Sequence, residues 1–164
     1  MKKEPDKVMT LCFVCDYLRS EIIFALKNSR LGEGLLNGYG GKVRPGKGIE
    51  LEAKRELKAE STLVASKMRK IGVVFYEFLD NGKLFECHIF LVDIADCKGQ
   101  PKETKEMGPP ERYKMDMNFI PNDRMWQGDK FILPYIFDGQ DFHGWIFYDN
   151  PDEKNVLNHK LSVC

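Results

Sequence analysis

One segment, Gly41–Thr62, restricts the folds open to this chain more than any other. It reads GKVRPGKGIELEAKRELKAEST, in which Ile49, Ala53 and Leu57 recur every four residues. This spacing places the three side chains on one face and predicts an amphipathic helix from about Gly48 to Ser61. An apolar stripe of this kind is buried only against another layer of secondary structure, so the rest of the chain must supply that layer.

Strand patterns flank this helix on both sides. They are expected at Val8–Cys15, Glu21–Asn28, Arg69–Leu79, Leu84–Ile94, Asp141–Asp149 and Asn155–Val163. The first two are separated by a polar turn around 16–20 and together predict a hairpin. The Asn-Gly pair in Asp80–Lys83 predicts a second hairpin, because this dipeptide readily adopts the positive φ angles of a tight turn.

The remaining segments are predicted as loops and one further helical region. Glycines are dense between Gly32 and Gly48, which indicates a long irregular segment of the kind that often carries function. Gly99–Tyr113 is predicted as a loop with a strand end, and Met115–Phe137 as a short helical region. This order of elements indicates the α+β class with a mixed sheet, and the length of 164 residues predicts a single domain, 1–164.

The charge balance argues against two classes of partner. The chain has 25 Lys and Arg residues and 25 Asp and Glu residues, so its net charge is near zero. Proteins that bind polymeric nucleic acid or membrane surfaces normally show a basic excess or patch, and neither partner is expected here. An anionic ligand must therefore be met locally, by a few side chains, backbone N–H groups or a metal ion.

The sequence favours a reduced, cytoplasmic protein. The opening MKKEPDKV is charged and precedes no signal-peptide pattern, and no segment approaches the about 18 apolar residues of a membrane span. The cysteines are odd in number and lack the spacing of a disulfide scaffold. Cys12 and Cys15 form a C-x-x-C within the apolar run LCFVC, which fits a buried strand better than a metal or redox pair.

The predicted helix carries a row of carboxylates. Glu52, Glu56 and Glu60 recur every four residues, so they stack along one face. Like charges at this spacing repel unless solvent, a counter-charge or a divalent cation screens them. Two interpretations follow from the residues alone, a solvated acidic face and a site for a hard cation such as Mg²⁺, which prefers oxygen ligands.

The same segment resembles the Nudix box, the signature of the Nudix hydrolases. That pattern is Gly, five residues, Glu, seven residues, Arg-Glu, an aliphatic residue, any residue, Glu-Glu, any residue, Gly and an aliphatic residue. On this chain Gly41 begins the box, Arg55-Glu56-Leu57 matches its centre, Glu60 is the second Glu of the pair and Leu63 closes it.

Three positions depart from the pattern: Lys47 for the first Glu, Ala59 for the first Glu of the pair, and Thr62 for the late Gly. In the family the first Glu supports the box through the arginine, so Lys47 would face Arg55 with like charge. Glu50 or Glu52 is then the expected replacement partner of Arg55. The box position of Ala59 commonly supplies a metal ligand, and its loss predicts an altered site.

Outside the box the resemblance runs from about residue 8 to the C-terminus. It narrows to the MutT-type Nudix hydrolases, in particular the animal enzymes that act on oxidised purine nucleoside triphosphates. The stretches that carry it are LNGYGGKV, KIGVVFYEF, HIFLVD, KEMGPP, MWQGD and FHGWIFY. The resemblance implies an α/β/α sandwich, with a mixed sheet between helices. It also implies attack of a metal-activated water on a nucleoside diphosphate linkage.

The resemblance implies a catalytic and metal-binding set. Glu56 and Glu60, together with the carbonyl of Gly41, would hold Mg²⁺, with Mn²⁺ as the alternative ion. Glu106 in KEMGPP would join them or act as the base, and the family pattern does not separate these two roles. Lys27 would meet a phosphate of the substrate or be an exposed lysine at a strand end.

The resemblance also implies a set of substrate-binding residues: Thr10, Lys27, Asn37, Tyr76, Trp126, Gly128 and Asp129. Asn37 and Asp129 would contact the purine, and Trp126 would stack on its face or belong to the core. Gly128 stands where the relatives have the first of two neighbouring aspartates, and Tyr76 stands where they have phenylalanine. A preference for one oxidised base is therefore not implied.

The function favoured by the sequence is Mg²⁺-dependent hydrolysis of an oxidised purine nucleoside triphosphate to the monophosphate and pyrophosphate. The protein would act as a monomer on a small nucleotide and clean the nucleotide pool. Two alternatives stay open: hydrolysis of another nucleoside diphosphate-linked compound, and a weakened module that only binds a nucleotide. The retained base-binding residues argue against the first, and retention of Glu56 and Glu60 argues against the second.

Overall fold

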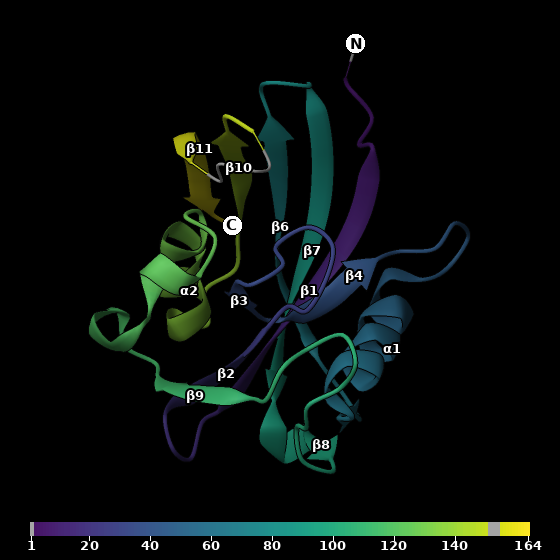
Figure 1. Ribbon diagram of the computed structural model, residues 1–164, viewed down its shortest axis with the longest axis vertical. Coiled ribbons are helices and arrows are strands. Elements are labelled where there is room, and N and C mark those ends of the chain that lie inside the picture. Colours follow the sequence, from purple (N-terminus) through teal and green to yellow (C-terminus); the bar gives the residue numbers. More distant parts are fainter. Residues whose placement is uncertain (1, 151–154) are drawn as a thin grey trace.

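The computed structural model describes residues 2–150 and 155–164 and contains a large mixed sheet with one helix on each face (Figure 1). The strands of this sheet are β1 (Lys7–Asp16), β2 (Glu21–Leu26), β3 (Leu36–Asn37), β4 (Tyr39–Lys42), β6 (Arg69–Phe78), β7 (Lys83–Asp93), β9 (Glu111–Lys114), β10 (Phe142–Tyr148) and β11 (Val156–Val163). The helices are α1 (Ile49–Ser61) and α2 (Asp129–Asp138). A separate small sheet pairs β5 (Val64–Ala65) with β8 (Cys97–Lys98).

The main sheet has the strand order β11-β10-β6-β7-β1-β2-β3, with β4 paired to β1 and β9 paired to β2. Both predicted hairpins are confirmed, because β1 pairs antiparallel with β2 and β6 pairs antiparallel with β7. The parallel pairs β1–β7 and β10–β6 join segments that are distant in the sequence. The sheet is therefore mixed, as predicted.

The two faces of the sheet bury separate apolar layers. Cys12 and Val14 point to the face covered by α1, where they pack with Ala53 and Leu57. The side chains alternate along a strand, so the neighbouring residues of β1 point to the opposite layer, which α2 covers. Cys12 and Cys15 consequently lie on different faces as buried free thiols, and the α/β/α arrangement is confirmed.

The prediction of an irregular segment at Gly32–Gly48 is wrong for part of its length. β4 lies within it and pairs antiparallel with β1, so that Gly40 faces Leu11 and Gly41 faces Thr10. A Cβ atom at Gly40 would run into the carbonyl oxygen of Thr10. Glycine is needed here because two backbones lie close together. The sequence prediction treated these glycines as signs of an irregular segment and so missed the strand.

The predicted helical region at Met115–Phe137 is divided into smaller elements. Two 3₁₀ turns, Met117–Phe119 and Asn122–Arg124, precede α2, which extends to Asp138 and contains Pro134 in its interior. The strand end predicted near Tyr113 is β9. Within residues 2–150 and 155–164, no helix has the length and apolar character needed to span a bilayer.

Candidate active site

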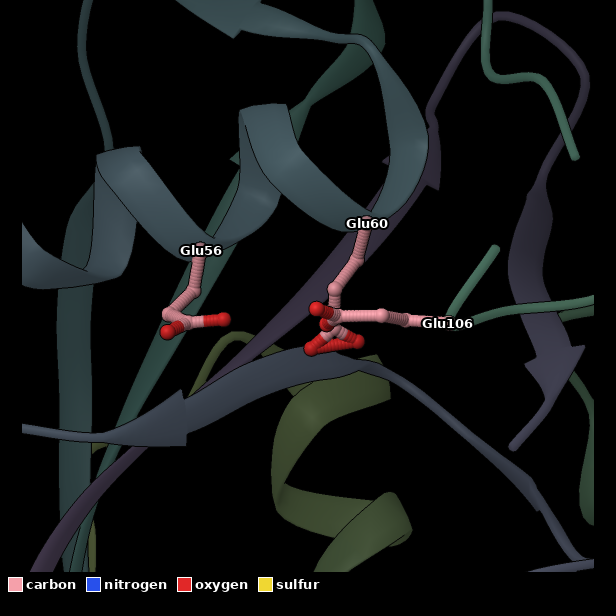
Figure 2. Close-up of side chains that lie close together, drawn as sticks. All are labelled: Glu56, Glu60 and Glu106. Carbon is pink, nitrogen blue, oxygen red and sulfur yellow. The ribbon is translucent and has the colours of Figure 1, made fainter. Parts of the chain in front are cut away.

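Three glutamates from two parts of the chain form an acidic cluster. Glu56 and Glu60 project from the same side of α1, one turn apart, and Glu106 approaches them from the loop between β8 and β9 (Figure 2). Each offers one carboxylate oxygen, and these three atoms all lie within 4.8 Å of one another. The structure thus brings together the three carboxylates that the sequence predicted.

Hydrogen bonds hold the loop of Glu106 against the rest of the site. The backbone N–H of Asn28, two residues after the end of β2, donates to the carbonyl of Glu106 at 3.0 Å. The hydroxyl of Thr104 donates to the carbonyl of Glu60 at 2.9 Å, at the end of α1. The loop of Glu106 is therefore held both to the end of α1, which carries Glu56 and Glu60, and to the segment that follows β2.

The electrostatics of the cluster favour a cation. Burial and then the charge of Glu56 raise the pKa of Glu60 to about 8, while the N–H of Gly40 and the charge of Lys27 act in the opposite direction. The N–H of Gly40 donates to Glu60 Oε1 at 3.2 Å. Carboxylates this close together repel one another, and a divalent cation between them would relieve the repulsion. Their oxygen atoms are the ligands that Mg²⁺ and Mn²⁺ prefer.

Gly41 lets the backbone of β4 lie directly beside Glu56. A Cβ atom at this position would lie 2.8 Å from the carboxyl carbon of Glu56, closer than side chains tolerate. The hydroxyl of Thr10 points to the carbonyl oxygen of Gly41 at a distance of 3.5 Å. The backbone of Gly41 thus lies beside Glu56, and its carbonyl oxygen lies near the hydroxyl of Thr10.

Glu52, the third carboxylate of the helical row, does not belong to the cluster. Its side chain is 1% exposed and lies between two guanidinium groups, with Arg44 Nη2 at 2.8 Å and Arg55 Nε at 3.0 Å from its Oε1. These partners, Arg44 first, hold the pKa of Glu52 well below its usual range. Glu52, not Glu50, is therefore the partner of Arg55, and the like-charge problem posed by Lys47 is removed.

A pocket opens beside the acidic cluster. Its lining includes the predicted residues Thr10, Lys27, Asn37, Tyr76, Trp126 and Asp129, and it also includes Glu60 of the cluster. Aromatic rings shape the apolar part, since Tyr148 lies edge-on to Trp126 at a centroid distance of 5.3 Å and stacks with Tyr76 at 6.1 Å. The pocket therefore has aromatic walls and shares Glu60 with the acidic cluster.

Asp129 is a polar group at the apolar end of this pocket. It is buried, and its Oδ2 has no hydrogen-bond partner among the residues that the structure describes. Burial alone raises the pKa of Asp129 to about 7. A buried carboxyl oxygen without a partner is costly, and a hydrogen-bonding group on a ligand in the pocket would satisfy it.

Gly128 is the one predicted substrate-binding residue that does not line the pocket. Its N–H donates to the hydroxyl of Tyr148 at 2.9 Å, so this donor is already engaged. Tyr148 itself lines the pocket and was not predicted from the sequence. Its place is set by the parallel pairing of β10 with β6, where it lies opposite Phe78, and no local sequence signal reveals that pairing.

The chain is similar to two animal hydrolases over most of its length. It is 34% identical over 155 residues to the oxidized purine nucleoside triphosphate hydrolase of Danio rerio, covering 94% of both chains. The mouse (Mus musculus) protein of the same name is 33% identical over 140 residues, covering 85% of both. Among solved structures, the MutT protein of Bacillus halodurans superposes with a TM-score of 0.77 at 23% identity, covering 95% of this chain and 97% of the other.

The chain belongs to the MutT-type Nudix hydrolases. It is thus a member of a family of pyrophosphohydrolases, and its sheet and helices have the Nudix arrangement. No protein-family model matches the chain. A second structure of this type, the MutT Nudix hydrolase of Burkholderia pseudomallei, has a TM-score of 0.68 at 16% identity and covers 80% of this chain and 98% of its own.

The departures from the Nudix box have distinct structural consequences. Lys47 and Ala59 are both exposed, and neither side chain is part of the acidic cluster. Thr62 ends α1 with a φ of 69°, a left-handed conformation that favours glycine, as the family pattern has there. Its hydroxyl donates to the carbonyl of Gln100 at 3.0 Å, which ties the strained end of the helix to the loop that carries Glu106.

Proposed function

We propose that this protein hydrolyses oxidised purine nucleoside triphosphates to the monophosphate and pyrophosphate, with Mg²⁺ held by Glu56, Glu60, Glu106 and the carbonyl of Gly41. One observation carries the proposal: Glu60 belongs both to the acidic cluster and to the lining of the aromatic pocket. A nucleotide whose base enters the pocket therefore has its phosphates directed to the carboxylates.

The pocket residues have separate roles in this proposal. Trp126 and Tyr148 provide aromatic surfaces for a purine, a contact worth about 1–3 kcal/mol per base in nucleic-acid sites. Asp129 and Asn37 offer hydrogen-bonding groups to the edge of the base. Lys27 lies on the side of the pocket near Glu60, where its positive charge can pair with a phosphate.

The carboxylates and the cation share the chemistry of the cluster. A divalent cation bound there neutralises the phosphates and lowers the pKa of the attacking water. Glu106 is the exposed member of the cluster, so it can exchange protons with solvent. Glu56 and Glu60 are the less exposed members on a rigid helix, and they are suited to hold the cation in place.

Pyrophosphate release from a panel of normal and oxidised purine triphosphates, with Mg²⁺ and with EDTA, tests the proposal. We expect metal-dependent release that is faster for an oxidised base. The Glu60→Gln variant should lose at least about 100-fold in kcat, because removal of a charged metal ligand weakens both binding and activation. The control is Glu50→Gln, which makes the same change at an exposed position of α1 and should leave kcat unchanged.

Two results would contradict this proposal. Full turnover by a folded Glu60→Gln variant would show that the cluster is not the metal site. Nucleotide binding without pyrophosphate release from any substrate would instead favour a binding module. Ala59 would then explain the loss of activity, because its box position commonly supplies a metal ligand. A thermal shift with the non-hydrolysed nucleotide distinguishes binding from its absence.

A further inference from the structure

A chain of charged contacts leads from Glu52 to the acidic cluster. Both carboxylate oxygens of Glu52 accept hydrogen bonds from Arg44, from its backbone N–H at 3.1 Å and from its guanidinium at 2.8 Å. Both oxygens also accept from the guanidinium of Arg55, at 3.0 and 3.1 Å. Glu52 is thus a buried carboxylate with a full set of charged donors, and its geometry is closely restricted.

Arg55 carries this restriction to Glu56. Its Nη2 donates to Glu52 and also to Glu56 Oε1 at 2.7 Å. The guanidinium of Arg55 is planar and is held at two nitrogens by Glu52. The direction of its hydrogen bond to Glu56 is therefore fixed as well. On its other side Glu56 meets the backbone of Gly41, where even a Cβ atom would not fit. The carboxylate of Glu56 is therefore confined between Arg55 and β4.

The charges along this chain balance. Two acidic residues, Glu52 and Glu56, face two basic residues, Arg44 and Arg55. Glu52 pairs with both arginines, and Arg55 also pairs with Glu56. Without Glu52, the two guanidinium groups would repel each other. Arg55 would then be free to turn toward solvent or to neutralise Glu56 in a different geometry, which would weaken the attraction of Glu56 for a cation.

We propose that Glu52 is a positioning residue that, through Arg55, holds Glu56 in the orientation needed for the divalent cation. In the Nudix box this support is expected from the residue at position 47, which is an exposed lysine here. The support has moved to α1 itself, three residues before the arginine, and Arg44 supplies the additional positive charge. This inference rests on the proposed function for the identity of the cation site.

Binding of Mn²⁺ to the nucleotide-free protein, measured by titration calorimetry, tests the role of Glu52 without requiring turnover. We expect the Glu52→Gln variant to bind Mn²⁺ at least about tenfold more weakly, the range found when an outer partner of a metal ligand is removed. Glu50→Gln is the matched control on the same turn of α1, and its Mn²⁺ affinity should equal that of the wild-type protein. Arg55→Lys should reproduce the loss, since lysine keeps the charge but lacks the planar fork that holds Glu52 at two nitrogens while contacting Glu56.

A rescue variant separates this role from a purely structural one. Adding Lys47→Glu to Glu52→Gln returns an acid to the box position and should restore most of the lost Mn²⁺ affinity. A merely structural Glu52 predicts lower thermal stability with unchanged Mn²⁺ affinity. Where Glu52→Gln alone does not fold, the rescue variant and Arg55→Lys carry the test.

The outcomes distinguish this inference from the proposed function. Unchanged Mn²⁺ affinity in folded Glu52→Gln, or a double variant that binds as weakly as the single one, overturns the role of Glu52 even if the wild-type protein is an active hydrolase. A wild-type protein that binds Mn²⁺ and releases no pyrophosphate contradicts the proposed function. In that case the affinity of Glu52→Gln still decides whether Glu52 positions Glu56.

Discussion

Glu60 belongs to both the acidic cluster and the pocket, and its pKa depends on its burial and on the charge of Glu56. It is 4% exposed, and burial with the charge of Glu56 raises its pKa to about 8. Near neutral pH a proton and a divalent cation therefore compete for the same carboxylate. Metal binding at this residue should strengthen as the pH rises toward 8, because fewer protons must then be displaced.

The free energy of unfolding in EDTA should fall as the pH rises from about 6.5 to about 8. In this window the folded protein keeps a proton on Glu60, whereas the unfolded chain loses it near pH 4.5. The unfolded state binds fewer protons, so stability decreases with pH, and Glu60 contributes up to about 1.4 kcal/mol per pH unit to this decrease. Urea unfolding at several pH values measures this slope.

The Glu60→Gln variant provides the comparison for this slope. Asp129 also has a raised pKa, about 7, and contributes with the same sign in both proteins. The pKa of His88 is lowered by burial, so its opposing contribution is confined to pH values below about 6.5. The difference between the two proteins isolates Glu60, and equal slopes would show that its pKa is not raised in the folded state.

At the scale of secondary structure, β4 has two glycines with different reasons to be glycine. A side chain at Gly40 would collide with the main chain of Thr10 in β1, whereas one at Gly41 would meet the carboxylate of Glu56. The first obstacle is rigid backbone and the second is the end of a flexible side chain. Gly40 is thus required for strand pairing and Gly41 for the site.

Gly41→Ala should preserve the fold and damage the site. The added methyl group must displace the carboxylate of Glu56, which should weaken Mn²⁺ binding by about tenfold or more, as for other disturbed metal ligands. Thermal unfolding and Mn²⁺ calorimetry on the same sample measure the two effects. Gly48→Ala is the control, because its nearest neighbour would lie at 3.9 Å.

The opposite pattern would contradict this account of β4. If Gly41→Ala lost stability but bound Mn²⁺ normally, glycine at this position would be needed for strand pairing and not for the acidic cluster. Gly40→Ala gives the reference for such a strand effect, since its Cβ atom would collide with backbone. We expect that variant to be strongly destabilised, because neither of the paired strands can move away without breaking the ladder.

At the scale of the whole molecule, the site exists only where distant parts of the chain meet. Glu60 and Thr104 are 44 residues apart, and the hydrogen bond between them joins the end of α1 to the loop of Glu106. The hydroxyl of Thr104 also accepts from the N–H of Met107 at 3.3 Å. This one side chain therefore orders the turn on which Glu106 is presented.

Thr104→Val should loosen this junction while keeping the volume of the side chain. Loss of the hydroxyl should reduce the free energy of unfolding by about 1 kcal/mol, and the more mobile Glu106 should weaken Mn²⁺ binding. Ser66→Ala is the control, since it removes an exposed hydroxyl bond to the carbonyl of Asp96, outside the loop of Glu106. Equal Mn²⁺ affinity in the two variants would show that Thr104 does not position Glu106.

Local patterns predicted most of the secondary structure. The helix was predicted from its apolar residues at four-residue spacing, and α1 begins and ends within a residue of the predicted bounds. The hairpins were predicted because their turns are formed by residues adjacent in the sequence. β4 was missed because its glycines have no side-chain alternation, and its strand character arises only from pairing with β1.

In the candidate site, too, local patterns predicted some features and only the folded structure revealed others. Spacing along one helix placed Glu56 and Glu60 together, and the resemblance to a known family added Glu106, Asn37, Trp126 and Asp129. Spacing could not show that Glu52 leaves the acidic row, because its partner Arg44 belongs to the loop before the helix.

The family, the α1 carboxylates and the order of the main elements follow from the amino-acid sequence alone, since these depend on residue identity and short-range periodicity. Three features of the site emerge only from the folded arrangement: Tyr148 lines the pocket, its hydroxyl accepts from the N–H of Gly128, and Glu52 pairs with Arg55. These three facts depend on which strands pair and which faces meet. Such pairing is settled by burial of the whole core, which no single segment encodes.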